Sequence, residues 1–154
     1  MKNIENRITH WNKGYKTSFQ GDTFTGVNDD LISSTKKKKV LEIGPGEGRQ
    51  FDVVSPHSSE YHIVDISDSV LSLEKYKDCK RHKLKSYKMN LRRKFNVVHF
   101  WYVIHHVLNE EIEDFLSFVV RHTRKDGLVF FNYPIINKMD HRDLSNDGIK
   151  TTPM

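Results

Sequence analysis

The sequence predicts an α/β fold with a doubly wound sheet of about five mostly parallel strands in the order 3-2-1-4-5. Short, nearly continuous apolar runs alternate with segments of helical periodicity, as in βαβ units whose strands are buried on both faces. The first apolar run leads directly into a glycine-rich turn at residues 44–48. No internal repeat or linker divides the 154 residues, so we expect a single domain over residues 1–154.

Five apolar or β-prone segments are expected to form the strands. They are residues 39–43, 61–65, 84–89, 96–101 and 128–133, of which the third is the weakest. Between them, helical spacing predicts helices over 69–76 and 110–124, with Asp68 and Asn109 as their N-caps. We expect Asp126-Gly127 to form the turn into the fifth strand.

Composition and charge exclude several classes of protein. The single Cys79 rules out an intrachain disulfide and a cysteine-cluster metal site, and no metal is expected. No apolar run reaches the roughly 20 residues that span a bilayer, and no signal sequence is evident, so we expect no membrane contact and a cytoplasmic location. The formal charge of +5 leaves nucleic acid open as a partner. It is not favoured, because no nucleic-acid-binding motif organises the basic residues.

The glycine turn predicts a ligand site at the carboxyl edge of the sheet. Bare backbone at Gly44, Gly46 and Gly48 would let a ligand approach closely. Asp65 ends the next expected strand, at the spacing where an acid meets ribose hydroxyls in nucleotide-binding α/β folds. The turn and the acid together indicate a nucleoside-bearing ligand.

Two further residues separate the ligand classes. Arg49 stands where the third glycine of a dinucleotide fingerprint would fall, and no Gly-Lys-Ser/Thr follows, so NAD and ATP are disfavoured. Glu42, two residues before Gly44, places an acid beside the turn. An acid there suits a cationic ligand such as S-adenosylmethionine better than a pyrophosphate.

These segments resemble the class I S-adenosylmethionine-dependent methyltransferases, in particular the small-molecule methyltransferase-domain group. The resemblance is carried by residues 40–48, 63–67, 96–107 and 124–130, and it extends from about Trp11 to Tyr133. It implies a Rossmann-like fold and an enzyme that moves a methyl group from S-adenosyl-L-methionine to oxygen or nitrogen of a small-molecule acceptor by in-line displacement. Within the single domain we expect an N-terminal lid and helix over 1–38, a cofactor-binding core over 39–133 and a polar tail over 134–154.

The resemblance also implies roles for individual residues. The implied cofactor-binding residues are Glu42, Gly44, Gly46, Gly48, Asp65, Ile66, Asn90, His99 and Phe100. Glu42 and the glycines would hold the methionine end, Asp65 the ribose, and Ile66 and Asn90 the adenine. His99 and Phe100 would line the pocket beneath the methyl group, with ordinary core packing as the alternative for Ile66 and Phe100.

His105 and His106 are the candidates for a substrate-facing catalytic base, and packed or surface histidines are the alternative. Five aromatic residues are candidates for a wall that contacts the acceptor substrate, and ordinary packing in the lid and core is the alternative. They are Trp11, Tyr15, Phe19, Trp101 and Tyr102.

The sequence departs from the family after the fifth expected strand. There the family continues with a helix and an antiparallel strand pair, whereas here a polar segment over 137–150 leads to the last residue, Met154. We therefore expect a sheet that lacks the pair, with residues 128–131 as an exposed apolar edge that a second protomer or a partner would cover. The alternative functions are a non-catalytic cofactor-binding or partner-binding remnant and, less favoured, an RNA-modifying methyltransferase.

Overall fold

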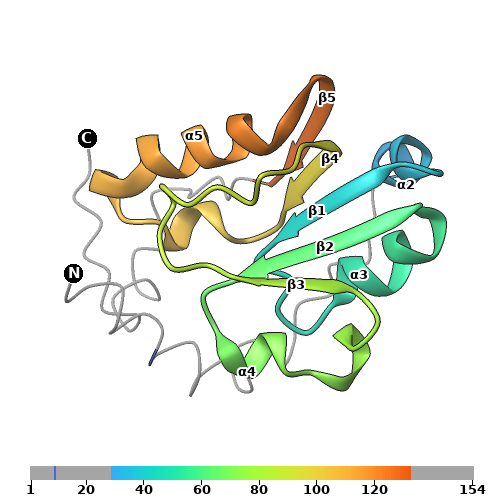
Figure 1. The fold of residues 1–154 in the computed structure, drawn as a ribbon, viewed down its shortest axis with the longest axis horizontal. Coiled ribbons are helices and arrows are strands. Elements are labelled where there is room, and N and C mark those ends of the chain that lie inside the picture. The colour runs from blue at the N-terminus through green and yellow to red at the C-terminus, as the bar shows by residue number, and fades with distance from the viewer. Residues whose placement is uncertain (1–8, 10–28, 133–154) are drawn as a thin grey trace, which may run out of the picture.

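The computed structural model describes Thr9 and residues 29–132, which form one sheet with helices on both faces (Figure 1). The strands are β1 (Lys39–Ile43), β2 (Glu60–Asp65), β3 (Lys80–Lys83), β4 (Phe95–Phe100) and β5 (Thr123–Phe131). Their order is β3-β2-β1-β4-β5, and every pair is parallel. The predicted α/β, Rossmann-like class and the strand order 3-2-1-4-5 are confirmed, and no antiparallel strand occurs within 29–132.

The helices are short except for the last one. They are α2 (Asp29–Thr35), α3 (Arg49–Val54), α4 (Asp68–Leu71) and α5 (Ile112–His122), with 3-10 turns η1 (Ser55–His57), η2 (Glu74–Tyr76), η3 (Ile104–His106) and η4 (Asn109–Glu111). Figure 1 shows α5 over one face of the sheet and α3 and α4 over the other. The chain thus crosses between the faces as a doubly wound fold requires.

Each face of the sheet has its own apolar core. On the α5 face, Phe100 packs against Phe115 of α5 with ring centroids 5.1 Å apart. On the opposite face, Val40 and Ile63 pack with Tyr76 and the residues of α2 and α3. Because side chains alternate along a strand, residues of β1 contribute to both cores, and this explains the nearly continuous apolar runs in the sequence.

The third strand lies earlier than predicted. β3 is Lys80–Lys83, whereas the expectation was 84–89. This strand forms an edge of the sheet, so it pairs with β2 on one side only and carries charged side chains. The apolar residues that suggested the later strand, Leu84 and Tyr87, are instead buried in the α5-side core from a loop.

Two predicted helices have different bounds. The helix expected over 69–76 is split into α4 and η2, and its N-cap is Ser67 instead of Asp68, because Ser67 Oγ accepts from Val70 N at 3.2 Å. The helix expected over 110–124 begins at Ile112 and ends at His122. Asn109 does not cap it but starts η4.

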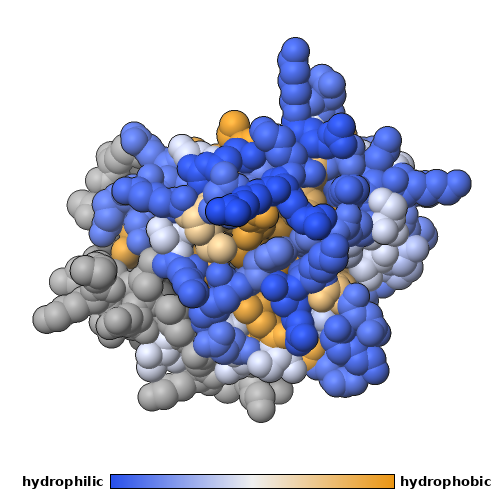
Figure 2. Space-filling model, viewed as in Figure 1, coloured by the Kyte–Doolittle hydropathy of each residue, from blue (hydrophilic) through white to orange (hydrophobic). Residues whose placement is uncertain are grey.

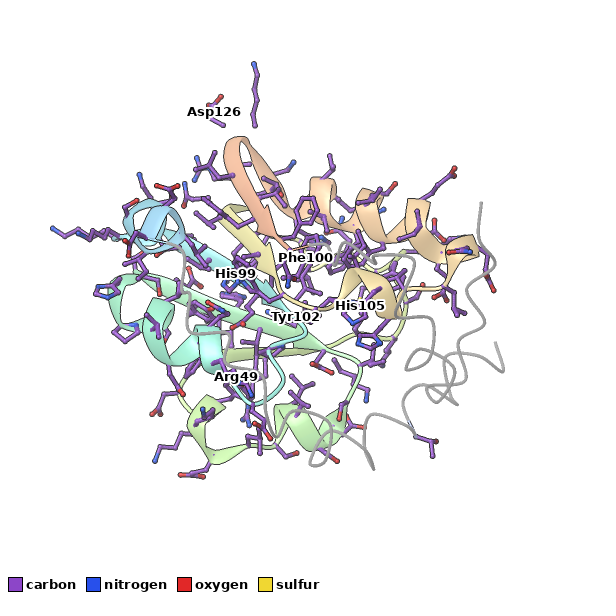
Figure 3. The ribbon with its side chains drawn as sticks, turned by 180° about the vertical axis from the view of Figure 1, so that it is seen from behind. Arg49, His99, Phe100, Tyr102, His105 and Asp126 are labelled. Atoms are coloured by element: carbon purple, nitrogen blue, oxygen red, sulfur yellow. The ribbon has the colours of Figure 1, made fainter. Side chains whose placement is uncertain are left out.

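The turn expected at Asp126-Gly127 lies inside β5. Phe95 of β4 pairs with Thr123, but Val97 pairs with Leu128, so residues 124–127 form an irregularity in the strand. In Figure 3 Asp126 lies at the far tip of this bend. No loop separates α5 from β5, because α5 ends at His122 and β5 begins at Thr123. Thr123 Oγ1 donates to the carbonyl of Val119 at 2.7 Å, so this residue also closes the last turn of the helix.

β5 forms the second edge of the sheet, and it exposes apolar side chains. Leu128 and Phe131 are each 49% exposed. The exposed apolar edge agrees with the sequence; its pairing with a second protomer or a partner stays a prediction. Hydrophilic residues cover most of the face shown in Figure 2, with small apolar patches between them.

Parts of the predicted organisation lie outside the described residues. Of the N-terminal lid predicted over 1–38, the structure describes Thr9 and the residues from Asp29 onward. The polar tail predicted over 134–154 lies outside the described residues. No helix in the described part of the chain is both long and apolar enough to cross a membrane.

Truncation of one buried ring should test the α5-side core. Phe115→Ala removes a fully buried side chain, and we expect a loss of about 3–5 kcal/mol in the free energy of unfolding. The neighbouring Leu116, which is 45% exposed, provides the matched control, and Leu116→Ala should change it by less than about 1 kcal/mol. Urea denaturation followed by circular dichroism measures both. Equal losses would contradict this assignment of the core.

Candidate active site

A mainly apolar cavity opens where β1, β2 and β4 end. Its wall includes the end of β1, the glycine turn, the start of α3, the end of β2 and residues 101–103 and 106–107 after β4. In parallel sheets the strand order reverses here, between β1 and β4, and ligands bind in the resulting crevice. The fold therefore places the glycine turn and the acid of β2 at the same site.

Gly44 and Gly46 make this turn possible in different ways. Gly44 has φ +66°, and a Cβ there would lie 2.6 Å from Cγ2 of Val103 on the opposite wall. Gly46 has φ +54°, and a Cβ there would meet no atom within 4 Å. Gly44 is thus required for packing, whereas Gly46 presents open backbone to a ligand.

Gly48, the third glycine of the motif, is buried and does not line the cavity. A Cβ on Gly48 would lie 2.8 Å from the hydroxyl of Tyr76, which donates to the carbonyl of Gly46 at 2.9 Å. Gly48 therefore supports the turn from behind, and its predicted contact with a cofactor would be indirect.

Glu42 is the most deeply buried acid of the cavity wall. It is 2% exposed, and its Oε2 accepts from the Tyr61 hydroxyl at 2.8 Å. Burial raises the pKa of Glu42 to about 8, against the lowering effect of the Tyr61 hydrogen bond; Asp52 and Asp65 add to the increase. Such a carboxyl is poised to ionise when a cation approaches it.

Asp65 brings a second buried carboxyl to the same cavity. It is 9% exposed, and its Oδ1 accepts from the backbone N–H of Ser67 at 2.7 Å, which orients the side chain. Burial raises the pKa of Asp65 to about 7, while the Ser67 hydrogen bond and Lys83 oppose the increase. Ile66 lines the wall next to it. The structure thus brings Glu42, Gly44, Gly46, Asp65 and Ile66 together.

Besides Gly48, three of the predicted cofactor-binding residues lie outside the cavity wall. Asn90 is exposed, and its Oδ1 accepts from Arg92 N at 2.7 Å, closing a local turn. His99 is fully buried on one face of β4, and Phe100 is buried on the other face against Phe115 (Figure 3). Neither His99 nor Phe100 lines the cavity, because their side chains are buried on the two faces of β4.

The two candidate bases, His105 and His106, differ in their position relative to the cavity. His106 lines the cavity, whereas His105 does not, although their ring centroids are 3.9 Å apart. His105 packs edge-on against Tyr102 with centroids 6.2 Å apart, and both follow the end of β4 in Figure 3. His106 is therefore the better placed of the two to contact an acceptor.

Sequence reasoning did not find Gln50, a polar residue of the wall. It lies in the first turn of α3 and lines the cavity. Within the part of the chain that the structure describes, its buried Oε1 has no hydrogen-bond partner. A lone glutamine after a glycine motif carries no recognisable signal, so only the fold could reveal it.

The aromatic wall is partly present. Trp101 and Tyr102 line the cavity, and Tyr87 joins them from the loop where a strand was expected. Trp11, Tyr15 and Phe19 lie outside the described residues. Among the residues that are described, no group of three His, Cys, Asp or Glu side chains could hold a metal ion.

Comparisons with known proteins place this geometry in a family. A profile of the Methyltransferase domain family matches residues 27–148, while comparison with curated sequences finds no match. The structure of DhpI with SAH has a TM-score of 0.70 at 18% identity, over 83% of this chain and 67% of DhpI.

Two other solved structures have the same fold. The N-methyltransferase NodS from Bradyrhizobium japonicum WM9, in complex with S-adenosyl-l-homocysteine, gives a TM-score of 0.66 at 13% identity, over 84% of this chain and 70% of NodS. DesVI from Streptomyces venezuelae gives 0.57 at 20% identity, over 66% of this chain and 46% of DesVI, so the chain spans less than half of that protein.

At these identities the structural likeness concerns the fold, whereas the profile covers most of the chain. As the sequence resemblance predicted, the chain belongs to the methyltransferase-domain family and has the fold of the class I S-adenosylmethionine-dependent methyltransferases.

Proposed function

We propose that this protein binds S-adenosyl-L-methionine and transfers its methyl group to oxygen or nitrogen of a small-molecule acceptor. One observation carries the proposal: an open glycine turn and two buried carboxyls, Glu42 and Asp65, share one mainly apolar cavity. An N-methyltransferase among the proteins of similar fold supports nitrogen as one acceptor atom.

The residues of the cavity fit this cofactor. A cationic, amine-bearing ligand would satisfy the buried Oε1 of Gln50 and the carboxyl of Glu42, which otherwise share a poorly solvated wall. Asp65 would accept from ribose hydroxyls, and Ile66 offers an apolar surface for a flat base. Gly46 would allow the ligand to approach the backbone.

The chain's own contribution to catalysis is alignment and exclusion of water. The bound cofactor supplies a methyl group on a sulfonium that is already activated for displacement. An acceptor held by Trp101, Tyr102 and Tyr87 would attack in line, and its proton would pass to His106 or to solvent. A base is needed only where the acceptor must lose its proton before it attacks.

Asp65→Ala tests the cofactor site. Loss of a charged hydrogen-bond acceptor should weaken binding of S-adenosylmethionine and S-adenosylhomocysteine by about 10- to 100-fold in calorimetric titrations. Asp68→Ala is the matched control, because Asp68 is an exposed acid that pairs with Lys83 and does not line the cavity. It should leave the affinity unchanged.

The same titrations separate the alternative functions. Absence of binding by folded wild-type protein would refute the methyltransferase proposal. Binding without transfer to any acceptor would favour a non-catalytic module. Salt-dependent binding of RNA would favour an RNA-modifying enzyme.

The buried Glu42 should make stability depend on pH. Its folded pKa, about 8, is above its ordinary value of 4.5, so its contribution to the free energy of unfolding is fully present below about pH 4.5 and is lost as the pH rises towards 8. The difference in this free energy between wild type and Glu42→Gln should therefore fall over that range, as measured by urea denaturation at several pH values.

Glu60 gives the control of opposite sign. Its neighbours Lys80 and His62 lower its pKa to about 2, so its contribution is lost only as the pH falls below about 4.5. The difference between wild type and Glu60→Gln should be nearly constant from pH 5 to 8. A falling difference for both variants would contradict a specific effect of burial at Glu42.

Gln50→Met should separate binding from stability. Removal of a buried amide whose oxygen lacks a partner should leave the ligand-free protein as stable as the wild type or slightly more stable. Binding of S-adenosylhomocysteine should weaken by about 5- to 10-fold if Gln50 accepts a hydrogen bond from the cofactor. Thermal unfolding and calorimetry measure the two effects, and unchanged affinity would exclude Gln50 from the binding site.

A further inference from the structure

A buried hydrogen-bond network joins two residues of the cavity wall through two residues that do not line it. Trp101 Nε1 lies 3.1 Å from His99 Nδ1, His99 Nε2 lies 2.7 Å from the Tyr61 hydroxyl, and that hydroxyl lies 2.8 Å from Glu42 Oε2. We call these four residues the Glu42 network. Glu42 and Trp101 line the cavity, whereas Tyr61 and His99 are buried beneath it.

The sheet itself assembles this network. Glu42 of β1 and His99 of β4 are register partners, and Tyr61 comes from β2 on the other side of β1. Alternation along β4 places His99 and Trp101 on the same side of the strand, towards α3. Figure 3 shows His99 in the interior of the molecule. Three neighbouring strands therefore contribute to one polar network within an otherwise apolar core.

Elementary donor and acceptor chemistry gives the network a single direction. An indole N–H can only donate, so His99 Nδ1 must accept and the neutral ring must carry its proton on Nε2. Nε2–H then donates to the Tyr61 oxygen, and the one tyrosine proton is directed to Glu42. The network runs Trp101 → His99 → Tyr61 → Glu42 and ends on the carboxyl.

Burial keeps His99 in this neutral form, because desolvation lowers its pKa to about 3. Hydrogen bonds aligned in series polarise one another, so a negative charge on the last acceptor strengthens each bond before it. A charge that develops on Glu42 should therefore tighten the bond that holds the Trp101 ring.

We propose that Tyr61 and His99 are positioning residues that couple the charge of Glu42 to the orientation of Trp101 in the cavity wall. The proposal rests on the function proposed above in one respect: the cofactor's cation would be what charges Glu42. A cation bound beside Glu42 would then determine the orientation of the Trp101 ring, which would contact the acceptor.

Other groups also act on Glu42, and a test must separate them. Asp52, Asp65 and Lys75 influence it through charge, and Tyr76 and Cys79 are close enough to interact with it electrostatically. None of these five belongs to the series of bonds between Glu42 and Trp101. Their substitution should shift the pH at which Glu42 ionises, without interrupting transmission to Trp101.

The experiment follows the Trp101 indole by NMR in the ligand-free protein. The sequence has two tryptophans, so Trp11→Phe leaves Trp101 as the single indole signal. The carboxyl carbon of Glu42 defines the pH range of its ionisation. We expect the chemical shift of the Trp101 indole N–H to change over that pH range. The change should be absent in Glu42→Gln and present in Asp65→Asn.

Tyr61→Phe provides the decisive comparison, since it removes only the hydroxyl that joins His99 to Glu42. The movement of the Trp101 resonance should be lost although Glu42 still ionises. Tyr76→Phe is the matched control, because it removes another buried hydroxyl near Glu42 that bonds to Gly46 instead, and it should keep the movement. Nitrogen chemical shifts of His99 should show a proton on Nε2 and none on Nδ1.

Either of two results would overturn the proposal: a folded Tyr61→Phe protein in which Trp101 still responds to Glu42, or a wild-type protein in which Glu42 ionises and Trp101 does not respond. If Tyr61→Phe does not fold, His99→Phe, which removes both ring nitrogens from the series of bonds between Trp101 and Tyr61, serves the same purpose. These measurements need no ligand. Failure of S-adenosylhomocysteine to bind would therefore refute the proposed function and leave the coupling to be judged separately.

Discussion

The structure depends on the turn that follows β1, whose first residue, Gly44, has no side chain. Gly44 donates its backbone N–H to the carbonyl of Val64 at 2.9 Å, which ties the turn to the end of β2. Its missing Cβ is also the space that Val103 fills. The turn, the end of β2 and the segment after β4 can therefore approach one another closely. A larger residue at position 44 would separate the walls that form the cavity.

Around this turn the protein accepts an electrostatic cost. Two carboxyls are buried in a mainly apolar wall, and burial raises the pKa of both towards neutrality. Groups with perturbed pKa values in a concave site are typical of functional sites, because only a ligand of matching charge repays their desolvation. The Tyr61 and Ser67 hydrogen bonds reduce the cost without removing it. The buried carboxyls that lower the stability of the ligand-free protein are therefore the groups that favour a cationic, hydroxyl-bearing ligand.

At the opposite end of the sheet a carboxyl has a lowered pKa instead of a raised one. Glu60, at the start of β2, lies within 3.4 Å of Lys39 and within 3.0 Å of Lys80 and Arg93. These cations come from or precede the first residues of their strands, so they gather around one carboxylate. Lys80, His62 and Lys39 lower the pKa of Glu60 to about 2. Part of the excess basic charge in the sequence is thus used in ion pairs at the base of the sheet. This explains how a basic chain can have a partly acidic cavity at the carboxyl ends of its strands.

The sequence by itself determined the class of fold, the strand order and the central part of the site. Those features depend on local signals: buried parallel strands leave apolar runs, a tight turn needs glycine, and an acid after the second strand has a characteristic spacing. Signals of this kind failed for the edge strand β3, because Lys80–Lys83 has no apolar side chain and pairs on one side only. Only the tertiary structure decided that Gln50 enters the cavity, that His99 and Asn90 do not, and that Tyr61 joins Glu42 to His99 and Trp101. The two contacts of Tyr61 join residues 19 and 38 positions apart, on β1, β2 and β4. Which side chains meet there depends on register and packing, which no local pattern encodes.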